Sequence, residues 1–174
     1  LTIEDYYCTD THWRQERLQH VVDRIGEQLD FSIDLSTLRK ESIYPFYGVY
    51  YGQSALPLQP DTICYYTDEI VENVRLWNLE DEPIESGYRP QITEQEGQVD
   101  LYDFYLGGAS PVQVLTSPQA QTDRKLIIFR DSFGSSLAPL LSEVYHEIIL
   151  IDTRYISASR LGEYVDFTDA DVLF

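Results

Sequence analysis

The last third of the chain contains two short, continuously apolar runs separated by a helical pattern. Residues 125–129 and 147–151 read Lys-Leu-Ile-Ile-Phe and Glu-Ile-Ile-Leu-Ile. Between them, apolar residues recur at the spacing of one helix face: Leu137, Leu140, Leu141 and Val144. Two strands joined through a helix are parallel, and continuous apolar strands are typical of a sheet covered on both faces. The sequence therefore predicts an α/β fold with a parallel central sheet.

Other patterns divide the rest of the chain. A helix is predicted near the start, where apolar residues follow a 3.6-residue period: Leu18, Val21, Val22, Ile25 and Leu29. Residues 42–115 carry short tyrosine-, valine- and isoleucine-rich runs broken by proline and glycine, which predicts a β-rich insertion. Within it, Ile70, Val74 and Leu76 alternate with polar residues as in a strand with one buried face. Residues 171–174 read as the start of another buried strand, so we expect a single domain, 1–174, truncated at its termini.

Charge restricts the possible partners. The chain has 174 residues, 30 acidic and 12 basic, and a formal net charge of -18. This excess of negative charge argues against binding to nucleic acid or anionic lipid, which both need a cationic face. No apolar run is long enough to span a membrane, and the chain has neither methionine nor a signal peptide. We expect membrane attachment only through an anchor in a missing amino-terminal segment.

Neither a metal nor a cofactor is expected. Cys8 and Cys64 are too few for a disulfide framework and lack the paired spacing of a zinc site, and the sequence leaves their pairing open. His12 and His20 lack the i, i+4 spacing of a helical metal site. His20 and His146 are interpreted as surface residues or as residues with satisfied hydrogen bonds.

Two short segments supply a serine, a histidine and an acid. Asp10-Thr11-His12-Trp13 lies near the start, and Arg130-Asp131-Ser132-Phe133-Gly134 directly follows the strand at 125–129. A residue between a strand and a helix lies at the carboxyl edge of the sheet, where open α/β folds place their active sites. A serine there becomes a nucleophile when a base takes its proton and a third group orients the base. Alternatively, Ser132 caps the following helix, and Asp10 caps the helix after His12.

These motifs, in this order, resemble the DHHW proteins and the related alginate acetylation proteins of the AlgX and AlgJ type, within the SGNH hydrolase-like superfamily. The resemblance extends to Leu106-Gly107-Gly108 and to Ile151-Asp152-Thr153-Arg154-Tyr155. It implies a three-layer α/β/α, flavodoxin-like fold. It also implies acyl transfer on carbohydrate hydroxyls, with Ser132 as nucleophile, His12 as general base and Asp10 as the group that orients His12.

Two positions depart from the family pattern. Arg130 stands where a glycine commonly precedes Asp-Ser, and Ala109 stands where an asparagine would help to bind the oxyanion. The backbone N–H groups of Ser132 and Gly108 remain as candidate oxyanion donors.

Three further residues are candidates for substrate binding. Tyr47 and Tyr50 belong to an aromatic segment that lines a groove or packs in the core. Arg154 follows the strand at 147–151, so it reaches the same edge of the sheet as Ser132 or pairs with a surface carboxylate.

The sequence therefore favours a serine esterase or O-acetyltransferase. We expect it to act on a bacterial cell-surface or extracellular polysaccharide, at an extracellular or cell-surface-anchored location. The alternative is a non-catalytic glycan-binding or surface-assembly protein that retains the fold. The sequence leaves open the choice between esterase and transferase, the acyl group and its donor, the glycan and the oligomeric state.

Overall fold

The computed structural model describes residues 1–54, 58–79, 84–94 and 100–174. Its strands are β1 (Arg39–Phe46), β2 (Asp61–Thr67), β3 (Arg75–Asn78), β4 (Ile84–Glu85), β5 (Val112–Thr116), β6 (Lys125–Phe129), β7 (Glu147–Ile151) and β8 (Ala170–Leu173). Its α-helices are α1 (Gln19–Leu29), α2 (Val49–Ser54), α3 (Glu69–Glu72) and α4 (Gly134–Leu141). Short 3-10 turns are η1 (Ile3–Asp5), η2 (Gln15–Arg17), η3 (Leu35–Thr37), η4 (Pro90–Glu94), η5 (Leu101–Phe104) and η6 (Ala158–Glu163).

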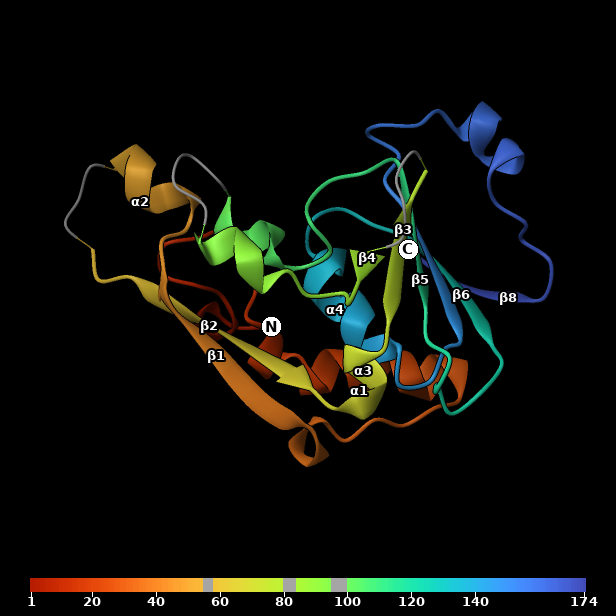
Figure 1. The fold of residues 1–174 in the computed structure, drawn as a ribbon, viewed down its shortest axis with the longest axis horizontal. Coiled ribbons are helices and arrows are strands. Elements are labelled where there is room, and N and C mark those ends of the chain that lie inside the picture. Colours follow the sequence, from red (N-terminus) through yellow and green to blue (C-terminus); the bar gives the residue numbers. More distant parts are fainter. Residues whose placement is uncertain (55–57, 80–83, 95–99) are drawn as a thin grey trace.

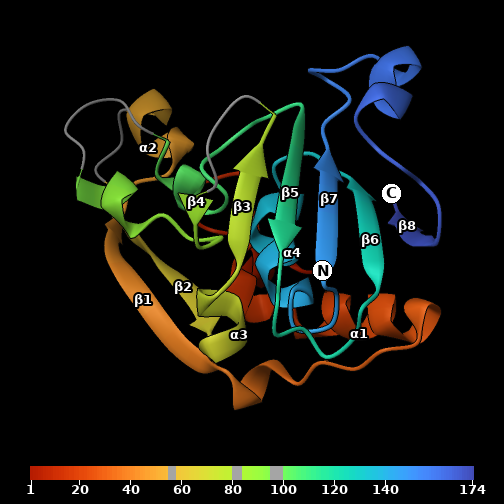
Figure 2. The same cartoon turned by 45° about the vertical axis from the view of Figure 1, so that its right-hand side comes forward.

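The main sheet has six strands in the order β4-β3-β5-β7-β6-β8 (Figure 2). Strand β6 is parallel to β7 and β8, which confirms the strand–helix–strand prediction. Strand β5 is antiparallel to β7 and to β3, and β3 is antiparallel to β4. The sheet is therefore mixed, which corrects the expectation of a parallel central sheet. Strands joined by loops can pair in either direction, and apolar periodicity does not reveal which.

The two faces of this sheet are covered differently. On one face, α1 and α4 pack on strand residues such as Leu126 and Ile128. On the other, Ile127 and Ile149 pack against Leu161 of η6 and its neighbours. Successive strand residues point to opposite faces, so two covered faces explain the unbroken apolar runs. Among the described residues the second face carries a 3-10 segment in place of an α-helix, so the expected three-layer α/β/α arrangement is not seen there.

Several element boundaries differ from the sequence prediction. Helix α4 ends before Val144, which nevertheless remains in the buried core. Ile70 belongs to α3 and Val74 follows it, because Asp68 accepts hydrogen bonds from the N–H groups of the first turn and starts a helix there. Residues 170–173 form an edge strand whose side chains are partly exposed, where a buried strand was expected.

A second core joins the antiparallel β1–β2 ribbon to η5. It is largely aromatic and comprises Tyr7, Phe46, Ile63, Val71, Tyr88, Tyr102, Phe104 and Tyr105. The buried phenols keep hydrogen-bond partners: the Tyr88 hydroxyl donates to the Tyr66 carbonyl at 2.7 Å. Much of the tyrosine in this chain therefore packs a core. Of the strands described within residues 42–115, β3, β4 and β5 extend the main sheet, whereas β2 pairs with β1 in a separate ribbon.

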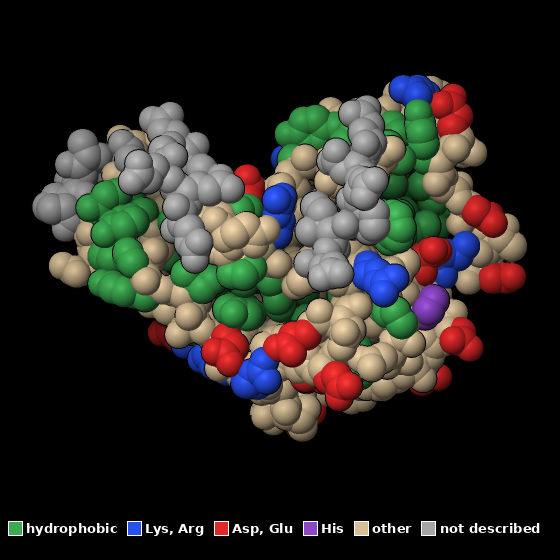
Figure 3. All heavy atoms as spheres, in the orientation of Figure 1, with side chains coloured by type: hydrophobic (Ala, Val, Ile, Leu, Met, Phe, Trp, Pro, Cys, Tyr) green, Lys and Arg blue, Asp and Glu red, His purple; other side chains and the backbone are tan. Residues whose placement is uncertain are grey.

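The ribbon and α2 lie at one end of the molecule and the main sheet at the other, with η4 and η5 between them (Figure 1). In the space-filling view, the upper outline has a notch between these two parts (Figure 3). No helix of the described ranges is long and apolar enough to cross a membrane.

Glu143, between α4 and β7, carries a buried carboxyl group. It is 5 % exposed, and its Oε1 has no hydrogen-bond partner among the described residues. Burial, reinforced by nearby Asp68, raises the pKa of Glu143 to about 7. Because the folded state holds this proton more tightly than the unfolded chain, ionisation destabilises the fold as pH rises from about 4.5 towards 7 and above.

We expect Glu143→Gln to stabilise the protein at pH 8 by about 2 kcal/mol and to change little at pH 5. Urea unfolding at both pH values measures the difference. Glu69→Gln, at an exposed carboxylate on α3, is the matched control and should show no such pH dependence. Equal stabilisation by Glu143→Gln at both pH values would contradict a raised pKa of Glu143.

Candidate active site

Ser132 lies on the tight turn between β6 and α4. The Asp131 carboxylate accepts a hydrogen bond from the Phe133 N–H at 3.0 Å, and the Asp131 carbonyl accepts one from the Gly134 N–H at 3.2 Å. Asp131 therefore closes the turn, and α4 has no side-chain N-cap hydrogen bond. The Ser132 hydroxyl does not cap the helix and points instead towards residues from the start of the chain.

The segment that carries Asp10 and His12 folds back on itself before η2. Tyr6 and Trp13 form an isolated antiparallel bridge, which turns the chain between them into a compact loop. The His12 N–H donates to Asp10 Oδ1 at 2.9 Å, and the Val49 N–H donates to Asp10 Oδ2 at 2.9 Å. At Gly48, a Cβ atom would lie 2.3 Å from the Thr9 carbonyl oxygen, so only glycine permits this approach.

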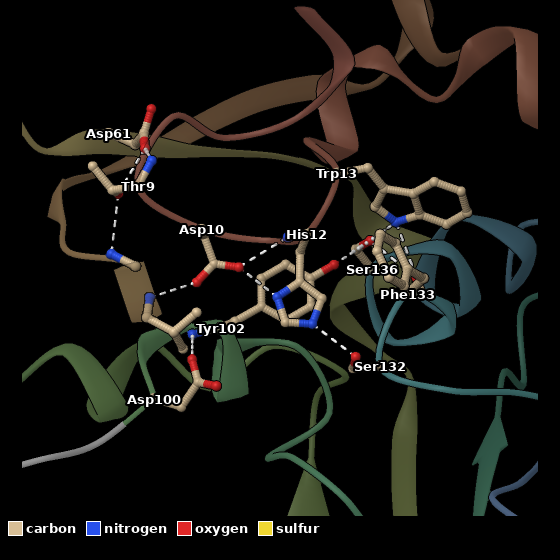
Figure 4. A network of polar contacts seen from close by, with 12 residues as sticks. Thr9, Asp10, His12, Trp13, Asp61, Asp100, Tyr102, Ser132, Phe133 and Ser136 are labelled. Carbon is tan, nitrogen blue, oxygen red and sulfur yellow. Dashed lines mark hydrogen bonds and ion pairs between the residues drawn. The ribbon is translucent and has the colours of Figure 1, made fainter. Parts of the chain in front are cut away.

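Asp10, His12 and Ser132 form a continuous chain of hydrogen bonds (Figure 4). His12 Nδ1 lies 2.5 Å from Asp10 Oδ1, and His12 Nε2 lies 2.7 Å from Ser132 Oγ. An ionised carboxylate only accepts, so Nδ1 carries the imidazole proton and Nε2 accepts from the serine hydroxyl. Asp10 and His12 are 2 % and 5 % exposed. The structure thus brings together all three residues that the sequence selected.

Hydrogen bonds keep the Asp10 carboxylate charged despite its burial. Burial alone would raise the pKa of Asp10. Donation from the His12 side chain, the His12 N–H and the Val49 N–H outweighs burial and holds the pKa of Asp10 below its ordinary value. A fixed negative charge therefore faces Nδ1, the nitrogen remote from Ser132.

Two aromatic rings, those of Tyr102 and Phe133, lie against the His12 ring. The Tyr102 ring stacks on the imidazole, with centroids 3.8 Å apart and planes within 4°. The Tyr102 hydroxyl donates to Ser136 Oγ at 2.8 Å, and Trp13 Nε1 donates to the same oxygen at 2.8 Å. Trp13 is the last residue of the first motif, but the motif alone assigned no role to it. Sequence reasoning missed Tyr102, because nothing in its local sequence distinguishes it from the other tyrosines.

A pocket of about 200 Å³ opens beside Ser132 and His12. Gly108 and Arg154, both selected from the sequence, line it, whereas Tyr47 and Tyr50 are not among the described residues that do. Both tyrosines lie at or beside α2, and the Tyr47 ring packs on Tyr51. Their role in substrate binding remains a prediction for more distant parts of a substrate.

The pocket carries charge of both signs. Arg154 donates two hydrogen bonds to Asp152, at 2.8 and 2.6 Å, and Asp152 is fully buried. This pair fixes Arg154 at the rim and differs from a loose pairing with a surface carboxylate. Asp103 also lines the pocket, and burial together with nearby Asp100 raises the pKa of Asp103. No motif in the sequence singles out Asp103.

Two residues that line the pocket, Ser132 and Gly108, carry the candidate oxyanion donors on their backbone. No described residue accepts a hydrogen bond from the Ser132 N–H. Across the pocket, Leu106, Gly107 and Gly108 have positive φ values of 61°, 72° and 94°, which two glycines make affordable. The Gly108 N–H makes only a long contact, 3.5 Å, to the Tyr105 carbonyl. The Ser132 N–H is thus available to an oxyanion, and the Gly108 N–H is only weakly engaged.

Metal-binding clusters and disulfides are not found in the described part of the chain. No group of three or more His, Cys, Asp or Glu residues there is arranged to hold a metal ion. Cys8 and Cys64 are free thiols. Burial raises the pKa of Cys64, so its thiol is not activated.

No model of a known protein family and no curated protein sequence matches this chain. Solved structures do match. A DHHW family protein from Eubacterium siraeum has a TM-score of 0.75 at 23% identity, over 98% of this chain and 58% of that one. PatB1 of Bacillus cereus with a sulfonyl adduct has a TM-score of 0.70 at 17% identity, over 97% and 58%. Another PatB1 structure has a TM-score of 0.68 at 18% identity, over 97% and 60%.

These likenesses establish a shared fold. They do not establish a shared reaction, because sequence identities this low say little about chemistry. The chain spans about three fifths of the length of each similar structure.

Proposed function

We propose that this chain is a serine esterase or O-acetyltransferase of the DHHW and SGNH-like type, acting on a cell-surface or extracellular polysaccharide. The observation that carries the proposal is the hydrogen-bonded series Asp10–His12–Ser132, which ends at an open pocket. A location outside the cytoplasm, free or anchored to the cell surface, belongs to the same proposal.

The geometry suits acyl transfer through a covalent intermediate. Ser132 Oγ attacks the acyl carbon, the carbonyl electron pair moves to the acyl oxygen, and the serine proton passes to His12 Nε2. When the intermediate collapses, the alcohol leaves with that proton and an acyl-serine remains. Water or a sugar hydroxyl then attacks the acyl-serine by the same steps in reverse. Esterase and transferase differ only in this acceptor.

The pocket limits the acyl group. Pockets for drug-sized ligands are commonly 300 to 1,000 Å³, whereas this one measures about 200 Å³. A small acyl group such as acetyl fits beside Ser132, while the glycan lies outside. The fold shared with PatB1, one structure of which carries a sulfonyl adduct, supports the proposal.

The alternative, a glycan-binding protein without catalysis, rests on Ala109 and Arg130 at two family positions. A fluorophosphonate, which modifies only an activated serine, separates the two. We expect mass spectrometry to find the adduct on Ser132 and to find none in Ser132→Ala or His12→Ala. His146→Ala, at an exposed histidine, should label like wild type. A folded wild-type protein without an adduct would exclude the enzyme and favour glycan binding.

Tyr102 provides a second test of the site. We expect Tyr102→Leu to lower kcat for 4-nitrophenyl acetate by about 10- to 100-fold, because the unsupported imidazole leaves its productive orientation. Tyr102→Phe keeps the stacked ring and loses only the bond to Ser136, so it should stay within about threefold of wild type. Equal losses in both variants would show that the hydroxyl, and not the stacked ring, matters.

A further inference from the structure

Arg130 occupies an unusual position for a cation. It directly precedes Asp131 and Ser132, is 8 % exposed, and lines the pocket together with Ser132. Its stem runs under the nucleophile turn, because a Cβ at Gly134 would lie 2.7 Å from the Arg130 Cβ. The residue that replaces the family glycine is therefore built into the turn that presents the serine.

The hydrogen bonds that the Arg130 guanidinium donates within the described residues all go to neutral groups. It donates to Ser135 Oγ at 2.8 Å, to Gln113 Oε1 at 2.5 Å, and more weakly to the Gly108 and Asp131 carbonyls, both at 3.4 Å. None of the ion pairs formed within the described ranges includes it. A buried charge without an ionic partner is costly to the folded state.

Two of the nearby carboxylates, Asp152 and Asp131, are engaged with other groups, while a third, Asp103, lines the same pocket and interacts with Arg130 electrostatically. Asp152 receives both Arg154 hydrogen bonds, and the Asp131 carboxylate accepts from the Phe133 N–H. Both attract Arg130 only from a distance, and burial lowers the pKa of Arg130. Positive charge beneath the pocket is thus only partly offset.

The same guanidinium connects the two loops that flank the reacting atoms. One side, Nη1, contacts Ser135 and the Asp131 carbonyl on the nucleophile side. The other, Nη2, contacts the Gly108 carbonyl and Gln113, whose amide donates to the Leu106 carbonyl at 2.9 Å. Arg130 therefore links the Gly108 loop, residues 106–108, to the turn that carries Ser132.

We propose that Arg130 is a positioning residue for the oxyanion site: it holds the Gly108 loop against the nucleophile turn and supplies a fixed positive charge beneath the pocket. This rests on the function proposed above. When Ser132 Oγ bonds to the acyl carbon, the carbonyl electron pair becomes a negative charge on the acyl oxygen beside the Ser132 N–H. A nearby cation in a poorly solvated site lowers the energy of that charge. Arg130 thereby offsets the missing amide at Ala109.

Steady-state hydrolysis of 4-nitrophenyl acetate by the full chain tests this role. We expect Arg130→Met to lower kcat by about 100-fold with KM little changed, since the charge develops only in the transition state. Arg130→Lys keeps the charge and should recover at least about tenfold of that loss. Arg24→Met, at an exposed arginine on α1, is the control and should match wild type. Near-ultraviolet circular dichroism checks that each variant is folded.

Two results would overturn the proposal. One is Arg130→Met with kcat within about threefold of wild type; the other is a raised KM at unchanged kcat, which would make Arg130 a ground-state binding residue. If Arg130→Met does not fold, the fluorophosphonate labelling rate of Arg130→Lys decides. A purely structural role predicts that folded Arg130→Lys is labelled as fast as wild type, whereas a role in positioning the oxyanion site predicts slower labelling. Fluorophosphonate labelling separates the two proposals. Wild-type labelling with equally fast labelling of Arg130→Met refutes only this one, whereas no wild-type labelling refutes both.

Discussion

Replacing Ser132 with alanine should lower kcat/KM for 4-nitrophenyl acetate by about 10⁴- to 10⁶-fold, and His12→Ala should lower it by a similar factor. The 2.7 Å contact between His12 Nε2 and Ser132 Oγ is the physical reason. Without the base, the serine hydroxyl keeps its proton and is a weak nucleophile. Without the hydroxyl, no acyl-enzyme forms and only the preorganised pocket remains.

The double variant distinguishes a catalytic unit from two separate effects. Groups that act in one step are strongly non-additive, so Ser132→Ala/His12→Ala should be little worse than either single change. Ser159→Ala, at an exposed serine on η6, is the control and should keep full activity. Losses that multiply in the double variant, or single losses below about tenfold, would contradict a Ser132–His12 pair.

The second large effect is expected at Asp10. Asp10→Asn keeps the size and shape of the side chain and should lower kcat by about 10³- to 10⁴-fold. Asparagine can present an N–H to His12 Nδ1, which favours the imidazole tautomer with its proton on Nε2. That tautomer cannot accept the Ser132 proton, so the geometry survives while the chemistry fails.

A matched carboxylate provides the control for Asp10. Asp34 also accepts a hydrogen bond from the N–H two residues later, at 2.9 Å to Ser36, but it is exposed and remote from the pocket. Asp34→Asn should leave kcat unchanged. An equal loss in both variants would point to general loosening of turns and would remove Asp10 from the mechanism.

Asp10 should also contribute to acid stability. Because the pKa of Asp10 is below its ordinary value in the folded state, its stabilising effect is present above the unfolded value of 3.8 and is lost as pH falls through the lower folded value. The stability gap between wild type and Asp10→Asn should therefore shrink in acid. Urea unfolding at pH 7 and pH 3 measures this change.

Local patterns were sufficient for much of the architecture. The apolar runs at 125–129 and 147–151 are the strands β6 and β7, and the intervening periodicity marks α4. Ser132 follows directly as the residue on the turn between them. Strand direction elsewhere was not accessible, because β3 and β5 enter the sheet through loops, which leave both directions open.

The sequence by itself determined which residues are available for chemistry: a serine at a strand end, and an acid and a histidine two positions apart. Local sequence is enough to place these residues on a turn or a short loop, because the backbone of a short segment has few allowed conformations. The tertiary structure alone decided how they meet, since Ser132 and His12 are joined by contacts across 120 positions. It also decided that Tyr102 stacks on His12 and that Arg130, at the pocket wall, forms no ion pair with any described residue. Such contacts depend on how distant elements pack, which no local periodicity encodes.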